Sequence, residues 1–417
     1  MSNSRGVVVI GAGAAGLMCA ITAARRGAGV TLLEGMPKPG AKILASGGSR
    51  CNLTHDEVFP EDYNGGSRRV VARLLREFDA RATREFFERL GVPTKLEPTG
   101  KIFPVSDSAV TVRDALLREA ADAGVELRCG ARVAALEKAA DGGFGIRMED
   151  GAALSTPRVA LATGGLSYPA TGSRGDGLAW ATALGHTLVP AVPALVPLTS
   201  RDPDARALSG LTVEAELILR RGEEGRELAR ARGSFLFTHF GYSGPAALDL
   251  SRHYLRARAG GPAAVTAAWL PGATFEQADT DLQAARESEP RRAVENLLAG
   301  MLPRRLAETL TARAGLARSG LSHSVLLSEL RREQRQALAR LLTAWPLDVD
   351  GTLGYEKAEA TAGGVALSEV NPSTMESRKC PGLFLCGEVL DVDGRLGGYN
   401  FQWAWSSGFV AGRGVAT

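Results

Sequence analysis

Residues 7–16 read Val7-Val-Val-Ile-Gly11-Ala-Gly13-Ala-Ala-Gly16, and this stretch decides the fold class. Its four apolar residues predict a buried strand, and an Ala-rich helix from Ala14 to Arg26 follows the glycines. A second strand is expected from Val30 to Glu34, which completes a strand–helix–strand unit over residues 6–34. This order is typical of the opening of a Rossmann-type dinucleotide-binding domain.

The glycines of this turn have separate expected tasks. Gly11 permits the tight turn, Gly13 lets backbone amides approach a pyrophosphate, and Gly16 lets the helix pack on the sheet. The helix N-terminus favours anionic phosphates, and Glu34 is placed to accept hydrogen bonds from an adenosine ribose. The motif alone leaves NAD and FAD open, and the alternative is a tight turn without a ligand.

The bulk composition is that of an ordinary globular protein. A length of 417 residues favours two or three subdomains, and 45% of the residues are hydrophobic while 23% are charged. No apolar run approaches the roughly 18 to 20 residues of a membrane span, and the five cysteines form no CxxC pair. We therefore expect a soluble, cytoplasmic protein with no membrane partner. No spacing of His, Cys, Asp and Glu suggests a metal site.

Changes of pattern along the chain predict a discontinuous first domain. Strand and helix alternate to about residue 185, three prolines then mark a boundary, and glycines return from residue 361. We predict an α/β fold in which residues 1–190 and 355–417 form the Rossmann-type domain. The inserted residues are expected to be β-rich over 191–273 and helical over 274–345.

Two further segments favour FAD over NAD. Ala162-Thr163-Gly164-Gly165 ends an apolar strand and resembles the crossing segment of two-dinucleotide-fold flavoproteins. The second segment, Gly382 to Glu388, resembles their strand-then-Gly-Asp element, whose carboxylate binds the ribityl chain. Glu388 stands where Asp is common, which lengthens the reach but keeps the acceptor. The alternative for Glu388 is an ordinary surface carboxylate.

Longer motifs resemble one family over nearly the whole chain. The segments that carry the resemblance are Lys42–Thr54, Thr163–Ser173, Phe237–Pro245, Thr361–Val365, Thr374–Ser377 and Gly387–Asn400. They are similar to the signatures of the BaiN/RdsA-type flavoproteins, also labelled aminoacetone-oxidase-like. The resemblance implies FAD and an inserted, β-barrel-like plus helical domain that covers the flavin.

The activities attached to that family are reduction of steroid-like enones, reduction of uracil in ribosomal RNA to dihydrouridine, and amine oxidation. The first two share one chemistry, in which hydride from reduced flavin adds to a carbon–carbon double bond conjugated to a carbonyl. We therefore expect such a reductase, acting on a small molecule or an RNA base. NAD(P)H is the expected transient donor. The alternatives are an oxidase of a small amine or alcohol, and an RNA-binding flavoprotein with structural or sensing FAD.

The motifs and the resemblance together give the residues expected to bind FAD. These are Gly11, Gly13, Ala14, Ala15, Gly16, Glu34, Lys42, Ser46, Gly47, Gly48, Arg50, Cys51, Asn52, Val133, Thr163, Gly164, Gly165, Gly387, Glu388, Gly397, Gly398, Tyr399, Asn400 and Phe401. Among them, Gly397 to Asn400 begin the last helix, whose amides and positive end would face the flavin edge that is negative when reduced.

Four residues are candidates for the proton donor: Cys51, Tyr168, His239 and Tyr399. Cys51 ranks first, because the neighbouring Arg50 would lower its pKa and raise its reactivity. Packing of Cys51 as a small apolar residue is an equal alternative. For His239 a structural role is favoured over orientation of a substrate carbonyl.

Charge is concentrated in one stretch. The net charge is +3, whereas residues 286–340 contain eleven arginines and six glutamates, 11 − 6 = +5. These helices could bind the phosphate backbone of ribosomal RNA. A solvated helical face with Glu/Arg pairs is the favoured alternative. The sequence leaves the oligomeric state open.

Overall fold

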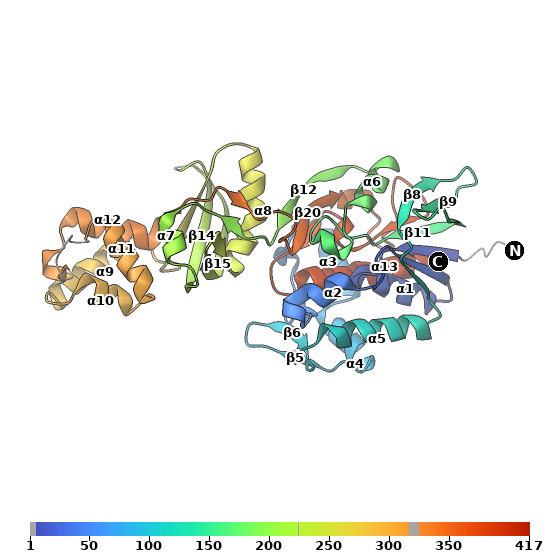
Figure 1. Ribbon diagram of the computed structural model, residues 1–417, viewed down its shortest axis with the longest axis horizontal. Coiled ribbons are helices and arrows are strands. Elements are labelled where there is room, and N and C mark those ends of the chain that lie inside the picture. Colours follow the sequence, from blue (N-terminus) through green and yellow to red (C-terminus); the bar gives the residue numbers. More distant parts are fainter. Residues whose placement is uncertain (1–5, 224, 317–324) are drawn as a thin grey trace. The chain divides into compact units, whose positions relative to one another are not determined.

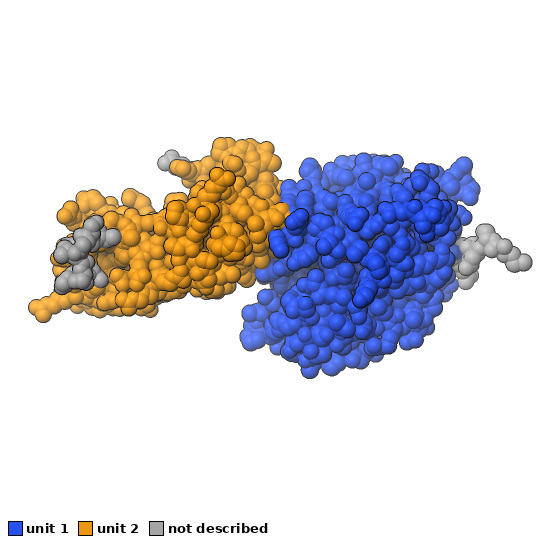
Figure 2. All heavy atoms as spheres, in the orientation of Figure 1, with its two compact units in different colours: residues 1–194, 355–417 blue, residues 195–354 orange. Residues whose placement is uncertain are grey.

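The computed structural model describes residues 6–223, 225–316 and 325–417. These form two compact units, residues 1–194 with 355–417 and residues 195–354 (Figures 1 and 2). The chain leaves the first unit after β12 (Leu188–Ala194) and re-enters it before β20 (Ala360–Val365), and the two strands pair antiparallel. Because they pair, the first unit is joined into one body by segments far apart in sequence.

The first unit is built on a parallel sheet. Its strands in the described residues are β1 (Gly6–Ile10), β2 (Gly29–Glu34), β7 (Glu126–Cys129), β11 (Arg158–Leu161) and β21 (Leu383–Leu385). They lie in the order β21-β11-β1-β2-β7, and β1 pairs in register with β11 from Val7↔Arg158 to Ile10↔Leu161. The chain winds outward from β1 to β2 and β7, then returns to the other side of β1. This arrangement confirms the predicted Rossmann-type α/β class.

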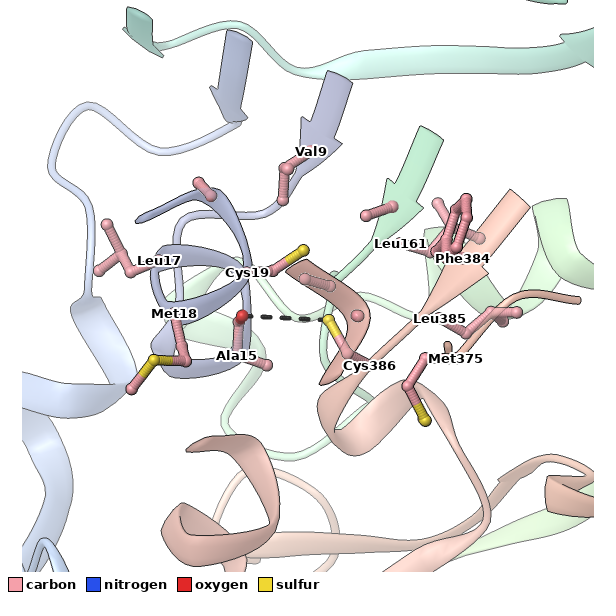
Figure 3. Packing of buried hydrophobic residues seen from close by; sticks show 14 of the residues in the cluster. Val9, Ala15, Leu17, Met18, Cys19, Leu161, Met375, Phe384, Leu385 and Cys386 are labelled. Atoms are coloured by element: carbon pink, nitrogen blue, oxygen red, sulfur yellow. Dashed lines mark hydrogen bonds between the residues drawn. The ribbon is translucent and has the colours of Figure 1, made fainter. Parts of the chain in front are cut away.

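Glycines let two helices approach each other under this sheet. Helix α1 (Ala14–Ala24) lies against α13 (Tyr399–Val415) (Figure 1). A Cβ on Gly408 would lie 2.5 Å from the Ala15 carbonyl oxygen, and a Cβ on Gly412 would lie 2.5 Å from that of Cys19. The Cys386 thiol also donates to the Ala15 carbonyl at 3.9 Å (Figure 3). Gly408 and Gly412 therefore let α13 pack closely against α1.

The remaining elements of the first unit surround this core. They are α2 (Ala41–Ala45), η1 (Ser46–Ser49), β3 (Thr54–His55), η2 (Pro60–Asp62), β4 (Tyr63–Gly65), α3 (Arg68–Glu77), α4 (Ala80–Arg89), β5 (Thr94–Leu96), β6 (Lys101–Pro104), α5 (Ala109–Asp122), β8 (Val133–Lys138), β9 (Phe144–Met148), β10 (Ala153–Thr156), η3 (Pro169–Thr171), α6 (Asp176–Ala183), η5 (Leu367–Glu369), η6 (Gly387–Val389) and β22 (Val392–Gly394). Strands β8 to β10 form a separate, small antiparallel sheet.

The second unit is an antiparallel sheet with helices. Its strands, in sheet order, are β18 (Trp345–Leu347), β17 (Ala263–Ala268), β14 (Thr212–Arg221), β15 (Glu227–Thr238), β16 (Gly241–Ser243), β13 (Leu198–Thr199) and β19 (Gly351–Thr352). Its helices are α7 (Pro203–Ala207), α8 (Pro245–Ala259), α9 (Phe275–Ser288), α10 (Val294–Ala299), α11 (Arg304–Arg313), η4 (Leu327–Glu329) and α12 (Arg332–Ala344). In the described residues no pairing joins β18 to β19. This antiparallel sheet domain belongs to the predicted mixed α/β fold class.

Candidate active site

The predicted cofactor segments meet at one edge of the parallel sheet. The glycine turn follows β1, Glu34 ends β2, Thr163 to Gly165 follow β11, and Gly387 with Glu388 follow β21. Because these strands are parallel, their carboxyl ends share one edge, and ligands of such sheets bind there at the point where the strand order reverses. A Cβ on Gly11 would lie 2.5 Å from the Ala162 carbonyl oxygen, so the β1 and β11 ends touch at that point.

The glycine turn has one crowded and one open position. A Cβ on Gly16 would lie 1.8 Å from the Gly11 carbonyl oxygen, whereas a Cβ on Gly13 would meet no protein atom within 4 Å. Glu34 is held beside this turn, because its carboxylate accepts hydrogen bonds from the Ala12 amide at 2.9 Å and the Met36 amide at 2.8 Å. Open space at Gly13 and a fixed carboxylate beside it match the needs of a dinucleotide's pyrophosphate and ribose.

The amino terminus of α13 forms a second part of the site. Gly398 has φ 96°, and a Cβ there would lie 2.7 Å from the Thr54 carbonyl oxygen and 2.9 Å from Asn52 Oδ1. Within the described part of the chain, Asn52 Oδ1 and Thr163 Oγ1 are buried without a hydrogen-bond partner. Two buried polar atoms lacking partners at this edge fit a polar ligand, because such atoms are otherwise costly to bury.

Tyr399 and Asn400 have protein partners at this helix end. The Tyr399 ring is stacked on His55 with centroids 5.0 Å apart, and its hydroxyl accepts a hydrogen bond from Arg395 at 3.3 Å. The Asn400 amide pairs with the backbone of Gly394, at 2.9 Å and 3.1 Å. Asn400 therefore fixes the loop before the helix.

Glu388 forms an ion pair with a lysine from a distant segment of the sequence. Lys42 Nζ lies 2.5 Å from Glu388 Oε2, and the exposed fractions of the two side chains are 27% and 18%. Glu388 therefore differs from an ordinary surface carboxylate, because it is mostly buried and paired. Lys42, Thr163 and Glu388 are brought to the same edge as the glycine turn.

Comparison with known proteins decides the family. The chain matches the HI0933-like protein Rossmann domain over residues 5–414. It belongs to the HI0933-like Rossmann family. The family confirms the predicted FAD-dependent oxidoreductase class.

Two relatives of this HI0933-like chain are similar over almost their whole length. The 3-dehydro-bile acid delta(4,6)-reductase of Clostridium scindens is 37% identical over 412 residues, covering 98% of each chain. The ribosomal RNA dihydrouridine synthase of Escherichia coli is 36% identical over 406 residues, covering 97% of this chain and 96% of the relative.

A solved structure shares the fold. The 3-ketosteroid-delta4-(5alpha)-dehydrogenase of Rhodococcus jostii RHA1 superposes with a TM-score of 0.52 at 19% identity, covering 100% of this chain and 98% of that one. At this identity the match concerns the fold alone.

In this HI0933-like protein Cys51 was ranked first among the proton donors because Arg50 was expected to lower its pKa, and that expectation is wrong. Protein atoms bury Cys51 completely, and burial raises the pKa of its thiol to about 12. Arg50 does not lower that pKa, because its guanidinium binds Glu97 at 2.7 Å and lies 4.0 Å from the centroid of the Phe103 ring. The structure favours the alternative in which Cys51 packs as a small apolar residue.

The other proton-donor candidates differ in accessibility. Tyr168 is half-buried and has φ 54°, and its amide donates to the Tyr355 carbonyl at 3.0 Å. Tyr399 is 2% exposed. His239 is exposed and belongs to the second unit.

The remaining predicted FAD-binding residues have two kinds of setting. Exposed or half-buried are Ala14, Ser46, Gly47, Gly48, Gly164 and Phe401; buried are Ala15, Val133, Gly165, Gly387 and Gly397. Val133 pairs with Met148 between β8 and β9, and Phe401 stacks on Trp405 with centroids 5.6 Å apart.

Sequence reasoning missed four residues at this edge: Ser167, Thr361, His55 and Arg395. Ser167 and Thr361 lie in motifs that carried the family resemblance, and this was the only signal for them. His55 directly follows such a motif, and Arg395 lies inside one. None has a local pattern that distinguishes a site residue from a loop residue.

The arginine-rich helices pair with acids more widely than expected. Arg335 binds Asp279 of α9 at 2.8 Å, and Arg313 binds Asp202 at 2.7 Å as well as Asp204. These aspartates lie outside residues 286–340, so they neutralise part of the excess positive charge of that stretch.

No helix in the described residues of this HI0933-like chain is long and apolar enough to cross a membrane.

Proposed function

We propose that this chain is an FAD-dependent reductase that saturates a carbon–carbon double bond conjugated to a carbonyl. The acceptor is a small polycyclic enone or a uracil base in ribosomal RNA, and NAD(P)H is the proposed electron donor. The observation that carries the proposal is the similarity, over 98% of each chain, to a relative named as a delta(4,6)-reductase.

A second relative supports the same chemistry. Its printed name is a dihydrouridine synthase, and dihydrouridine is formed when the uracil double bond next to a carbonyl is reduced. The two names therefore describe one type of bond change on two kinds of acceptor. They favour a reductase over the alternative of an amine oxidase.

The site is proposed to meet two requirements of this reaction, binding of the cofactor and stabilisation of its negative charge. The glycine turn and Glu34 are proposed to hold the adenosine and pyrophosphate parts of FAD, with Glu388 on the ribityl chain. When bound, FAD supplies the hydride that adds to one carbon of the double bond. The amino terminus of α13, at Gly398, offers backbone amides and a positive end to the negative charge of the reduced cofactor.

Tyr168 is the proposed proton donor to the neighbouring carbon. It lies in the loop after β11, is half-buried rather than sealed, and carries a hydroxyl that can donate. Its backbone lies in the left-handed region, and its amide is tied to the Tyr355 carbonyl. Cys51 lacks such access, because protein atoms cover it completely.

The test is product formation with two acceptors. Purified protein with NADPH is given either a 3-oxo-4-ene steroid or unmodified ribosomal RNA, and products are analysed by mass spectrometry for a gain of two hydrogens. Tyr168→Phe is expected to slow turnover by about 100-fold or more, whereas Cys51→Ala retains it. A parallel reaction contains a small amine and oxygen in place of NADPH and the acceptors. Peroxide formed there, with neither acceptor reduced, would favour the oxidase and overturn the proposal.

A further inference from the structure

A closed ring of hydrogen bonds surrounds Glu388. Lys42 Nζ donates to Ser167 Oγ at 2.6 Å and to Glu388 Oε2 at 2.5 Å, and Ser167 Oγ donates to Glu388 Oε1 at 2.6 Å. The Thr361 amide adds a further bond to Glu388 Oε1 at 3.0 Å. Both carboxylate oxygens are therefore held, by groups from three segments far apart in the sequence.

The ring is itself anchored to the backbone. The Thr361 hydroxyl oxygen accepts the Leu166 amide at 2.8 Å and the Ser167 amide at 3.0 Å, which fixes the loop after β11 against β20. A Cβ on Gly165 would lie 2.5 Å from Thr361 Oγ1 and 3.0 Å from Glu388 Oε1. Only glycine lets that loop approach closely enough for Ser167 to reach the carboxylate.

The charges explain why such a ring is needed. A carboxylate that is mostly buried is costly unless it is paired and hydrogen-bonded, and Lys42 supplies the opposite charge. Glutamate also has one more rotatable bond than aspartate, so an unheld Glu388 would sample several positions. Ser167 is fully buried and cannot itself meet a ligand, so its contacts serve to place its two partners.

We propose that Lys42 and Ser167 are positioning residues for FAD that act through Glu388. They hold the longer carboxylate in the position from which it accepts hydrogen bonds from the ribityl chain. This inference rests on the FAD site of the proposed function, but it concerns cofactor affinity rather than the acceptor that is reduced.

The experiment is a double-mutant cycle on FAD binding. Apoprotein of the full chain is titrated with FAD by flavin fluorescence, for wild type, Lys42→Met, Glu388→Gln and the double variant. Lys42→Met is expected to weaken FAD binding by about tenfold, the fold-change of one charge-assisted hydrogen bond. If Lys42 acts through Glu388, the double variant binds FAD no more weakly than Glu388→Gln alone.

Matched variants separate positioning from damage to the fold. Lys38→Met removes an exposed lysine from the same segment and is expected to bind FAD like wild type. Ser167→Ala removes no charge and should reproduce part of the Lys42→Met loss, while Lys42→Arg should restore part of the affinity. Urea unfolding of each apoprotein shows whether it is folded, and Ser167→Ala carries the test if Lys42→Met is not.

Two results would overturn the inference. One is wild-type FAD affinity in both Lys42→Met and Ser167→Ala. The other is a loss in the double variant equal to the product of the two single losses, which would mean that Lys42 acts independently of Glu388. Failure of the reductase proposal is distinguishable, because the coupling would persist in a protein that reduces neither acceptor.

Discussion

Substituting Gly13 by alanine separates folding from cofactor binding. Gly13 has φ −84° and ψ −168°, an extended conformation open to any residue, and its added Cβ would meet no protein atom within 4 Å. Alanine makes the unfolded chain less flexible than glycine does, which raises the free energy of unfolding by about 0.4–1 kcal/mol. Alanine is also a poorer helix N-cap residue, which lowers that free energy by a similar amount. We therefore expect the free energy of unfolding of the Gly13→Ala apoprotein to lie within about 1 kcal/mol of the wild-type value.

FAD binding should respond very differently. In the proposed FAD site, the new methyl group would lie where the pyrophosphate approaches the backbone amides. Loss of one hydrogen bond to a charged group is worth about 1.5–3 kcal/mol. This corresponds to roughly 10- to 100-fold weaker FAD binding.

Gly16→Ala is the contrasting variant, and the two are compared by the same assays. Its Cβ would lie 1.8 Å from the Gly11 carbonyl oxygen. This oxygen belongs to the backbone, so it cannot rotate away as the end of a flexible side chain could. Overpacking of this kind costs about 1–3 kcal/mol or more, so Gly16→Ala should lose stability as well as FAD. Urea unfolding of apoprotein and FAD titration measure both quantities. Wild-type FAD affinity in Gly13→Ala would refute the placement of the pyrophosphate at this turn.

Two further predictions concern stability and thiol reactivity. Burial, with Arg252 and Arg256 nearby, lowers the pKa of His253 to about 4. Between about pH 6.5 and pH 4 the unfolded chain therefore binds a proton at this histidine that the folded chain does not bind, and the folded state loses stability as the pH falls. Wild type should therefore lose about 2 kcal/mol more than His253→Gln between pH 7 and pH 5 in urea unfolding, and equal losses would contradict this. Of the five cysteines only Cys129 is exposed, so native protein should react with iodoacetamide at one thiol and denatured protein at five. Fast labelling of Cys51 in native protein would contradict its burial.

Local patterns predicted the opening unit to within two or three residues. The strand and helix of residues 6–26 were expected from periodicity, and the helix ends slightly earlier, at Ala24. The reason is Gly27, whose φ of 86° terminates the helical path. Elements whose ends are set by nearby glycines can be predicted because the determining residue is local.

The prolines lie close to the division between the two units. Pro190 and Pro193 belong to strand β12, which pairs with β20, and the first unit's opening segment ends with that strand at Ala194. The register shifts between Val189 and Val192, and proline is tolerated at such irregular or edge positions because no ladder hydrogen bond is lost there.

The chemistry of the site was harder to predict, because partners come from distant segments. Around Cys51 the sequence shows a polar loop, but Arg50 is drawn away by Glu97 and Phe103 of another segment. Lys42 and Glu388 are 346 residues apart, and no spacing rule links them. Their pairing depends on the return of the chain to the first unit.

The most direct test of the reductase chemistry is anaerobic reoxidation of the reduced holoenzyme. Protein whose flavin has been reduced is mixed, without oxygen, with one equivalent of a 3-oxo-4-ene steroid or of uridine-containing ribosomal RNA, and the yellow flavin absorbance is followed. We predict that one acceptor restores the absorbance and is recovered with two added hydrogens. Absorbance that returns only on admission of oxygen, with peroxide formed and both acceptors unchanged, would contradict the proposed function.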